Sequence, residues 1–309
     1  MMACMRILVA GSSGFLGTRL VDRLHDAGHD VTRLVRRPAQ QPDEATWKPS
    51  AGQLDPTLVA AADAVINLAG VGAGDKRWTP GYKSQIRSSR VDSTGTIARP
   101  ITQLDPGERP ETLLNSSAIG WYGDTGDRKV TEDAPAGTDF MADVCRVWEA
   151  AARPAEDAGV RVALLRTGLP LDEHGGLLKP QMLPFRLGVG GKIGGGKQWV
   201  PWIAMQDWLR AVEFLLEHDD IAGPVNVVGP EPVTNAAFTE VFGRLLHRPT
   251  VMPIPGFALQ VAYGGFAGEA LKSQRVMPGV LSKAGFTWNC PTLESALRAA
   301  LEPEQSAAK

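Results

Sequence analysis

With 309 residues, 43 % of them hydrophobic, the chain is long enough for one large domain or for a nucleotide-binding domain with a smaller lobe. Its net charge of −2, without a long basic tract, argues against nucleic acid as a partner. The absence of an apolar run of about 18 residues argues against a membrane span, and no signal peptide is expected. Cys4, Cys145 and Cys290 are far apart in the sequence and predict free thiols rather than a zinc or disulfide framework. We therefore expect a cytoplasmic protein without a metal site.

The N-terminal stretch over residues 5–17 carries the clearest motif. It joins a short apolar run, residues 7–10, to a helical apolar pattern through Gly11, Gly14 and Gly17. In a dinucleotide-binding turn the first glycine permits the tight turn, the second lets a pyrophosphate approach the backbone, and the third lets the helix lie close to the strand. Gly28 is then expected to end the helix, and residues 31–35 predict a second strand. A strand-to-helix turn without a ligand is the alternative interpretation.

Arg36 follows the second predicted strand, where a site that prefers NAD usually carries an acidic residue. A guanidinium can bond two phosphate oxygens, so arginine at this position favours the 2′-phosphate of NADP, although a solvated basic turn would look the same. A third buried strand over residues 64–70 ends in Leu68, Ala69 and Gly70. In a doubly wound sheet these residues lie at the carboxyl end of the strand, on the side of the ribose and nicotinamide.

The rest of the chain alternates between strands and helices, which predicts a parallel sheet with right-handed crossovers. Further helices are predicted over residues 80–104, 139–158, 206–217, 235–246, 257–271 and 292–301, and further strands over residues 112–118, 161–166 and 223–228. Residues 168–202 are rich in glycine and proline, and residues 191–197 within this stretch predict a flexible loop. The predicted fold class is α/β, a Rossmann-type doubly wound parallel sheet with a smaller, mostly helical C-terminal lobe. The Rossmann domain would comprise residues 1–167 and 205–228, and the substrate-binding lobe residues 168–204 and 229–309.

Several longer motifs lead to a family. They are Ile-Leu-Val-Ala-Gly-Ser-Ser-Gly-Phe-Leu-Gly (7–17), Val-Ile-Asn-Leu-Ala-Gly (65–70), Ser-Ser-Ala-Ile-Gly-Trp-Tyr-Gly (116–123), Cys-Arg-Val-Trp-Glu-Ala-Ala-Ala (145–152) and Leu-Pro-Phe-Arg-Leu-Gly-Val-Gly-Gly (183–191). With these motifs the chain resembles the atypical, epimerase-like family of extended short-chain dehydrogenases/reductases, whose members carry a C-terminal domain of unknown function.

The resemblance implies NADP(H) as the cofactor. It implies that the pyrophosphate binds at Gly11, Ser13, Gly14, Phe15 and Leu16, the 2′-phosphate at Arg36, and the middle of the cofactor at Leu68, Ala69 and Gly70. Arg90, on the helix that follows the third strand, is a further contact or, alternatively, a surface arginine.

The catalytic pair of the superfamily is missing. Short-chain dehydrogenases normally carry Tyr-x-x-x-Lys on one face of a helix, where the tyrosine moves a proton. Counted back from Glu149, the expected positions hold Met141 and Cys145. The candidates that remain are Ser117, where the superfamily places a hydroxyl that bonds the substrate, and Tyr122, which is either a substitute acid or an aromatic wall.

The leading expectation is an oxidoreductase or epimerase-like enzyme that acts on an unidentified small molecule by hydride exchange with NADP(H). A non-catalytic NADP(H) sensor that acts through a protein partner is the main alternative, consistent with the missing pair. A nucleotide-sugar epimerase is a third hypothesis. The sequence leaves open whether the chain forms a homodimer or binds another protein.

Overall fold

The computed structural model describes residues 4–250, 253–254 and 264–302, which fall into two compact units. The first unit comprises Met1–Trp121, Pro135–Arg166 and Val212–Val225. The second comprises Tyr122–Ala134, Thr167–Ala211 and Asn226–Lys309. The domain boundaries given above stay a prediction, because a division into compact units does not by itself define domains. None of the described helices is long and apolar enough to cross a membrane.

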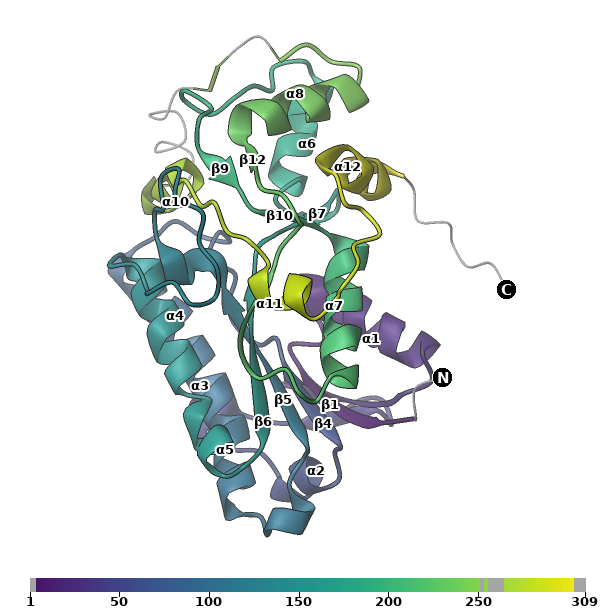
Figure 1. The fold of residues 1–309 in the computed structure, drawn as a ribbon. Helices are drawn as coiled ribbons and strands as arrows, with labels where there is room; N and C mark the ends of the chain where they lie inside the picture. The colour runs from purple at the N-terminus through teal and green to yellow at the C-terminus, as the bar shows by residue number, and fades with distance from the viewer. Residues whose placement is uncertain (1–3, 251–252, 255–263, 303–309) are drawn as a thin grey trace. The chain divides into compact units, whose positions relative to one another are not determined.

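A seven-stranded sheet forms the centre of the first unit (Figure 1), in the order β11-β6-β5-β4-β1-β2-β3. The strands are β1 (Arg6–Ala10), β2 (Asp30–Val35), β3 (Glu44–Thr46), β4 (Ala64–Asn67), β5 (Thr112–Ala118), β6 (Arg161–Thr167) and β11 (Gly223–Val227). β1 pairs in parallel with both β2 and β4. β2 in turn pairs in parallel with β3, and β4 pairs in parallel with β5. Because the order runs outward from β1 in both directions, the sheet is doubly wound, as predicted.

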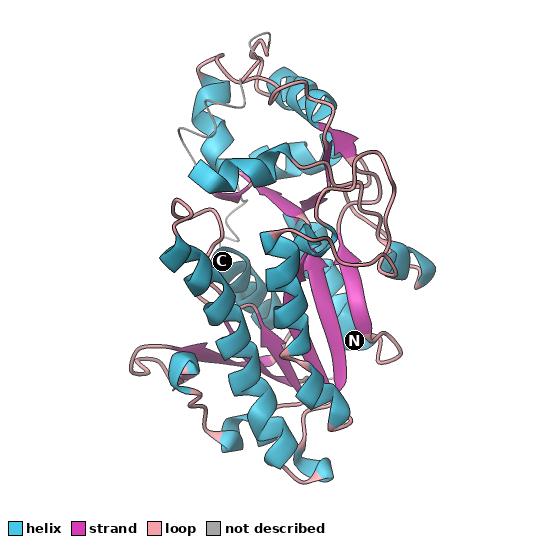
Figure 2. Ribbon diagram, turned by 90° about the vertical axis from the view of Figure 1, so that its left-hand side faces the viewer, coloured by secondary structure: helices cyan, strands magenta, loops and turns pink. Residues whose placement is uncertain are grey.

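Helices cover both faces of this sheet. They are α1 (Phe15–Asp26), α2 (Pro56–Ala60), α3 (Pro80–Gln103), α4 (Phe140–Ala150), α5 (Arg153–Asp157) and α7 (Met205–Glu217). Figure 2, seen from the side of α3 and α4, shows these two helices in front of the strands. On this face Ile97 and Ile101 of α3 pack against Leu8, Val65 and Leu113 of the central strands. On the other face α1 and α7 are joined by the ion pair between Arg23 and Glu213.

The prediction of a single helix over residues 139–158 is wrong in one respect, because the structure has two helices there, α4 and α5. Pro154 has no N–H group to donate to the carbonyl of Ala150, so the helical hydrogen-bond ladder breaks there. The end of α1 agrees with the expectation. Gly28 has a φ of 84°, and the N–H of His29 donates to the carbonyl of Leu24, a bond that needs this left-handed residue.

The second unit contains short strands and helices. They are β7 (Leu169–Asp172), β8 (Gly175–Gly176), β9 (Trp199–Val200), β10 (Trp202–Ala204), β12 (Val233–Thr234), α6 (Lys179–Arg186), α8 (Asn235–Leu245), α10 (Ala267–Leu271), α11 (Gly279–Lys283) and α12 (Leu293–Leu301). Its core is formed by Phe185, Trp202, Phe238, Phe242 and Leu297. Residues 191–197, expected as a flexible loop, lie between α6 and β9 and belong to neither, whereas the rest of the glycine- and proline-rich stretch contains β7, β8, α6 and β9. In this stretch Leu178, Met182 and Phe185 are buried despite the many glycines, whereas Leu183, Leu187 and Val189 are exposed. Of the helix expected over 257–271, residues 257–263 lie outside the described residues.

Candidate cofactor and reaction site

The glycine turn between β1 and α1 is closed on two sides and open on one. A Cβ atom at Gly11, whose φ is 80°, would lie 2.6 Å from the carbonyl carbon of Leu68. A Cβ at Gly17 would lie 2.1 Å from the carbonyl oxygen of Gly11. At Gly14, by contrast, the added atom would meet only the carbonyl oxygen of Gly11, at 3.3 Å. Gly11 and Gly17 are therefore required by backbone packing, and Gly14 lies on the exposed side of the turn.

The N-terminus of α1 lies on that exposed side. The helix has 12 residues and begins after Gly14, and no side chain of a described residue caps it. Ser13 and Gly14 are exposed, and Phe15 and Leu16 are half-buried. An uncapped helix N-terminus presents backbone N–H groups and the positive end of the helix dipole, which suits the phosphates of a dinucleotide. The donor set of this turn thus fits a pyrophosphate.

A buried asparagine pair shapes the end of β4, and the sequence prediction missed it. Asn67 donates from Nδ2 to Asn115 Oδ1 at 2.8 Å and to Thr94 Oγ1 at 3.0 Å. Its Oδ1 accepts the N–H of Ala69 at 3.1 Å, so the amide fixes the backbone just after the strand. A fully buried asparagine in an apolar strand must have partners, and this is the signal in the sequence that points to the network.

The structure brings Arg90 together with the segment that follows β4. The Arg90 Nη1 atom donates to the carbonyl oxygen of Val71 at 3.0 Å, and a Cβ atom at Gly70 would lie 3.3 Å from Arg90 Cγ. The guanidinium lies over the ring of Trp148, 4.9 Å from its centre. Arg90 Nε is buried and has no hydrogen-bond partner among the described residues. Burial lowers the pKa of Arg90, which is a partly buried cation rather than a surface arginine.

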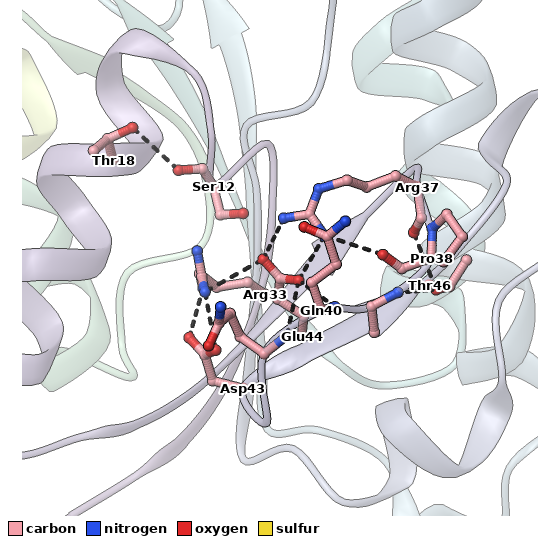
Figure 3. Close-up of polar contacts among 11 residues, drawn as sticks. Ser12, Thr18, Arg33, Arg37, Pro38, Gln40, Asp43, Glu44 and Thr46 are labelled. Carbon is pink, nitrogen blue, oxygen red and sulfur yellow. Dashed lines mark hydrogen bonds and ion pairs between the residues drawn. The ribbon is translucent and has the colours of Figure 1, made fainter.

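Three arginines lie in the last part of β2 or just after it, and Figure 3 shows two of them, Arg33 and Arg37, paired with carboxylates. Arg33 donates to Asp43 at 2.6 and 2.9 Å. Arg37 donates to Glu44 at 2.6 and 2.7 Å. Arg36 is exposed, and no hydrogen bond or ion pair joins it to a described residue. Because Ala10 pairs with Leu34, the glycine turn after β1 lies beside the end of β2 that carries Arg36. The predicted pyrophosphate and 2′-phosphate contacts therefore lie just beyond the ends of the neighbouring strands β1 and β2.

A buried ion pair adjoins the predicted reaction residue. Ser117, at the carboxyl end of β5, is 3 % exposed and donates to Glu149 Oε1 at 2.6 Å. Arg166 donates to the two oxygens of Glu149 at 2.9 and 3.0 Å. The guanidinium of Arg166 lies over the ring of Trp121, 4.0 Å from its centre. The sequence prediction treated Glu149 only as a marker, because its partner on β6 is not visible in a local pattern.

Met141 and Cys145, at the positions where the superfamily's tyrosine and lysine are expected from the sequence, lie on the buried face of α4. A Cβ atom at Gly120 would lie 3.2 Å from Met141 Cβ and 3.6 Å from Cys145 Sγ, so this face is packed against the turn after β5. Burial raises the pKa of Cys145 to about 12, and the thiol stays protonated at neutral pH. Neither side chain can transfer a proton as the tyrosine does.

Tyr122 belongs to the second unit. Its side chain is 3 % exposed, and its hydroxyl donates to Asn226 Oδ1 at 2.6 Å. Asn226 in turn donates from Nδ2 to the carbonyl of Met277 at 2.9 Å. This buried chain of hydrogen bonds favours the packing role for Tyr122 over the role of a substitute acid. Among the described residues, no group of three His, Cys, Asp or Glu side chains is placed to hold a metal ion.

Comparison with known proteins identifies the family. The model of the NAD dependent epimerase/dehydratase family matches residues 7–229 of this chain. The chain belongs to that family. A second model, that of the domain of unknown function DUF1731, matches residues 254–300. The resemblance to the atypical, epimerase-like short-chain dehydrogenases with a C-terminal domain of unknown function is thereby confirmed.

Members of the epimerase family resemble the chain over nearly its whole length. An epimerase family protein of Mycobacterium bovis is 42 % identical over 292 residues, which are 94 % of this chain and 96 % of that protein. The crystal structure of the human epimerase family protein SDR39U1 with NADPH is 33 % identical and has a TM-score of 0.87, covering 96 % of this chain and 99 % of that chain.

A nucleoside-diphosphate sugar epimerase from Corynebacterium glutamicum is also 33 % identical, with a TM-score of 0.80. This similarity covers 97 % of the present chain but only 58 % of that longer one. At 14 % identity and a TM-score of 0.75, the UDP-N-acetylglucosamine 4-epimerase from Bacillus cereus shares the fold.

Proposed function

We propose that this member of the epimerase/dehydratase family binds NADP(H) and exchanges hydride between the cofactor and a small molecule. The observation that carries the proposal is the uncapped turn at Gly14 beside Arg36, which follows the neighbouring strand, is exposed and has no hydrogen-bond or ion-pair partner among the described residues. The similarity to human SDR39U1, whose crystal structure contains NADPH, supports the choice of cofactor.

Different residues would bind different parts of the cofactor. The backbone N–H groups at Phe15 and Leu16 would bond the pyrophosphate, and the Arg36 guanidinium would bond the 2′-phosphate. The segment 68–70, fixed by Asn67, would lie along the middle of the cofactor. Arg90, whose Nε has no partner among the described residues, would place a cation beside that segment.

When bound, NADP(H) supplies the hydride donor or acceptor. Ser117 and Glu149 would handle the proton. When a substrate alcohol loses hydride from the carbon that carries its hydroxyl, the hydroxyl would donate its proton to Ser117 Oγ, and Ser117 would pass its own proton to Glu149 Oε1 along the existing 2.6 Å hydrogen bond. The reverse transfer accompanies reduction of a carbonyl. Arg166 balances the charge of Glu149 in this buried position.

The experiment is a screen of aldehydes and ketones for oxidation of NADPH by the wild-type protein, followed by Ser117→Ala on any active compound. Loss of a proton-transfer group is expected to lower kcat about 100-fold with unchanged NADPH affinity. Ser116→Ala, which removes the neighbouring buried hydroxyl, is the control and is expected to retain activity. Unchanged turnover in Ser117→Ala would contradict the assignment.

The second candidate function is an NADP(H) sensor that acts through a protein partner. The packing of Met141 and Cys145 against Gly120, which closes the face of α4 that carries the usual catalytic pair, favours it. NADPH binding without any turnover in the screen would support the sensor and contradict the enzyme. A difference in partner affinity between NADPH-loaded and NADP⁺-loaded protein would then be the expected signature.

A further inference from the structure

Glu44, the first residue of β3, is a buried carboxylate that the proposed function does not use. Its side chain is 1 % exposed. Besides the two bonds from Arg37, it accepts the backbone N–H of Gln40 at 2.9 Å and that of Gln41 at 3.3 Å. A buried carboxylate is stable only when its oxygens are paired, and here all its partners except Arg33 lie in the connection between β2 and β3. Glu44 therefore fastens this connection to the sheet.

Thr46, two residues further along β3, fastens the same connection through a neutral group. Its hydroxyl donates to the carbonyl oxygen of Arg37 at 3.1 Å and accepts the N–H of Ala39 at 3.0 Å. Arg37 is thus fixed through both its side chain and its backbone. Val35, on the other side of Arg36, is fixed in β2 opposite Thr46. The backbone of Arg36 consequently lies between two anchored residues, although no described residue pairs with its guanidinium.

Glu44 also decides which arginine is available to a ligand. Figure 3 shows its carboxylate bonded to Arg37 and close to Arg33, which lies opposite Glu44 in the sheet register. With Asp43 on Arg33 and Glu44 on Arg37, two of the three guanidinium groups have their charge balanced. Of these three arginines, Arg36 is the one without a carboxylate partner among the described residues.

We propose that Glu44 is a positioning residue for the selection of NADP(H) over NAD(H). It fastens the segment 37–41, so that Arg36 projects toward the position of the 2′-phosphate, and it keeps Arg37 engaged elsewhere. The inference rests on the proposed binding of NADP(H). It makes the selectivity depend on an acidic residue of β3 that never touches the cofactor.

The test is calorimetric titration of wild type and Glu44→Gln with NADPH and with NADH. Glutamine has the same size but weakens the attachment of Arg37, so the Kd for NADPH is expected to rise roughly fivefold while that for NADH changes less than about twofold. In an Arg36→Ala background the same substitution is expected to have no further effect on NADPH, because Glu44 acts through Arg36.

Two further variants distinguish the effect of attaching segment 37–41 to β3 from the effect of removing a negative charge. Thr46→Val loosens the same segment without changing charge and is expected to lower the NADPH preference as Glu44→Gln does. Asp43→Asn removes an equal charge from Arg33 but leaves the Glu44 and Thr46 attachments intact, so the preference is expected not to fall. If Glu44→Gln does not fold, the NADPH and NADH affinities of Thr46→Val are compared with those of wild type instead.

The results distinguish this inference from the proposed function. If wild type does not bind NADPH, the proposed function fails. If wild type prefers NADPH and Glu44→Gln binds it more tightly, weakens both nucleotides equally, or adds to the effect of Arg36→Ala, the inference about Glu44 is overturned and NADP(H) binding stands.

Discussion

At the residue scale, the arginines at the end of β2 show how far a sequence can lead. Arg36 could be predicted as a phosphate ligand because it follows a strand in a dinucleotide-binding pattern. The sequence could not tell that Arg33 and Arg37 are engaged, because their partners Asp43 and Glu44 come from a short strand beyond a turn. Pairing of this kind depends on strand register, which no local pattern encodes.

Glu44 also predicts an acid dependence of stability. The hydrogen bonds from Arg37 lower the pKa of Glu44 from 4.5 to about 2. A carboxyl group whose folded-state pKa is depressed contributes stability above its unfolded pKa and loses that contribution as pH falls through the folded one. The stability difference between wild type and Glu44→Gln is therefore expected to shrink between pH 4.5 and pH 2. Urea midpoints of both proteins at pH 3 and pH 7 measure this, and an equal difference at both pH values would contradict it.

At the element scale, the turn between β1 and α1 was predictable because its requirements are those of backbone geometry. Gly11 needs a positive φ, and Gly17 must let the helix lie against the turn, and both demands select glycine. The asparagine network behind Leu68 was not predicted, because Asn67 and Asn115 meet only when β4 and β5 pair. Likewise, Glu149 and Arg166 come from α4 and β6, which the sequence predicted as part of a helix and as a strand but did not connect.

Gly17→Ala tests the turn as an element. The new methyl group would overlap the carbonyl oxygen of Gly11, which is backbone and cannot yield without moving the helix. We expect a loss of about 2–3 kcal/mol in the free energy of unfolding, together with loss of NADPH binding. The matched control is Gly95→Ala in α3, where an added Cβ meets nothing within 4 Å and is expected to stabilise by about 0.5–1 kcal/mol. Similar urea midpoints for the two variants would contradict this view of the turn.

At the scale of the whole molecule, alternation of strands and helices was enough to predict the doubly wound sheet of the first unit. The second unit was predicted less well. Its strands have two to four residues and pair across long separations, as β12 does with β9 and β10 with β7, so no periodic pattern marks them. Glycines in residues 168–202 also hid the helix α6, whose Met182 and Phe185 are buried.

The assignment of this epimerase-family protein as an NADP(H)-binding protein depends most directly on Arg36. Calorimetric titration of wild type and Arg36→Ala with NADPH and NADH measures that dependence. We expect wild type to prefer NADPH, and Arg36→Ala to lose about 10- to 100-fold of its NADPH affinity with little change for NADH, because one charge-assisted phosphate contact is removed. Wild type that binds neither nucleotide, or an Arg36→Ala variant that keeps the full preference for NADPH, would contradict the assignment.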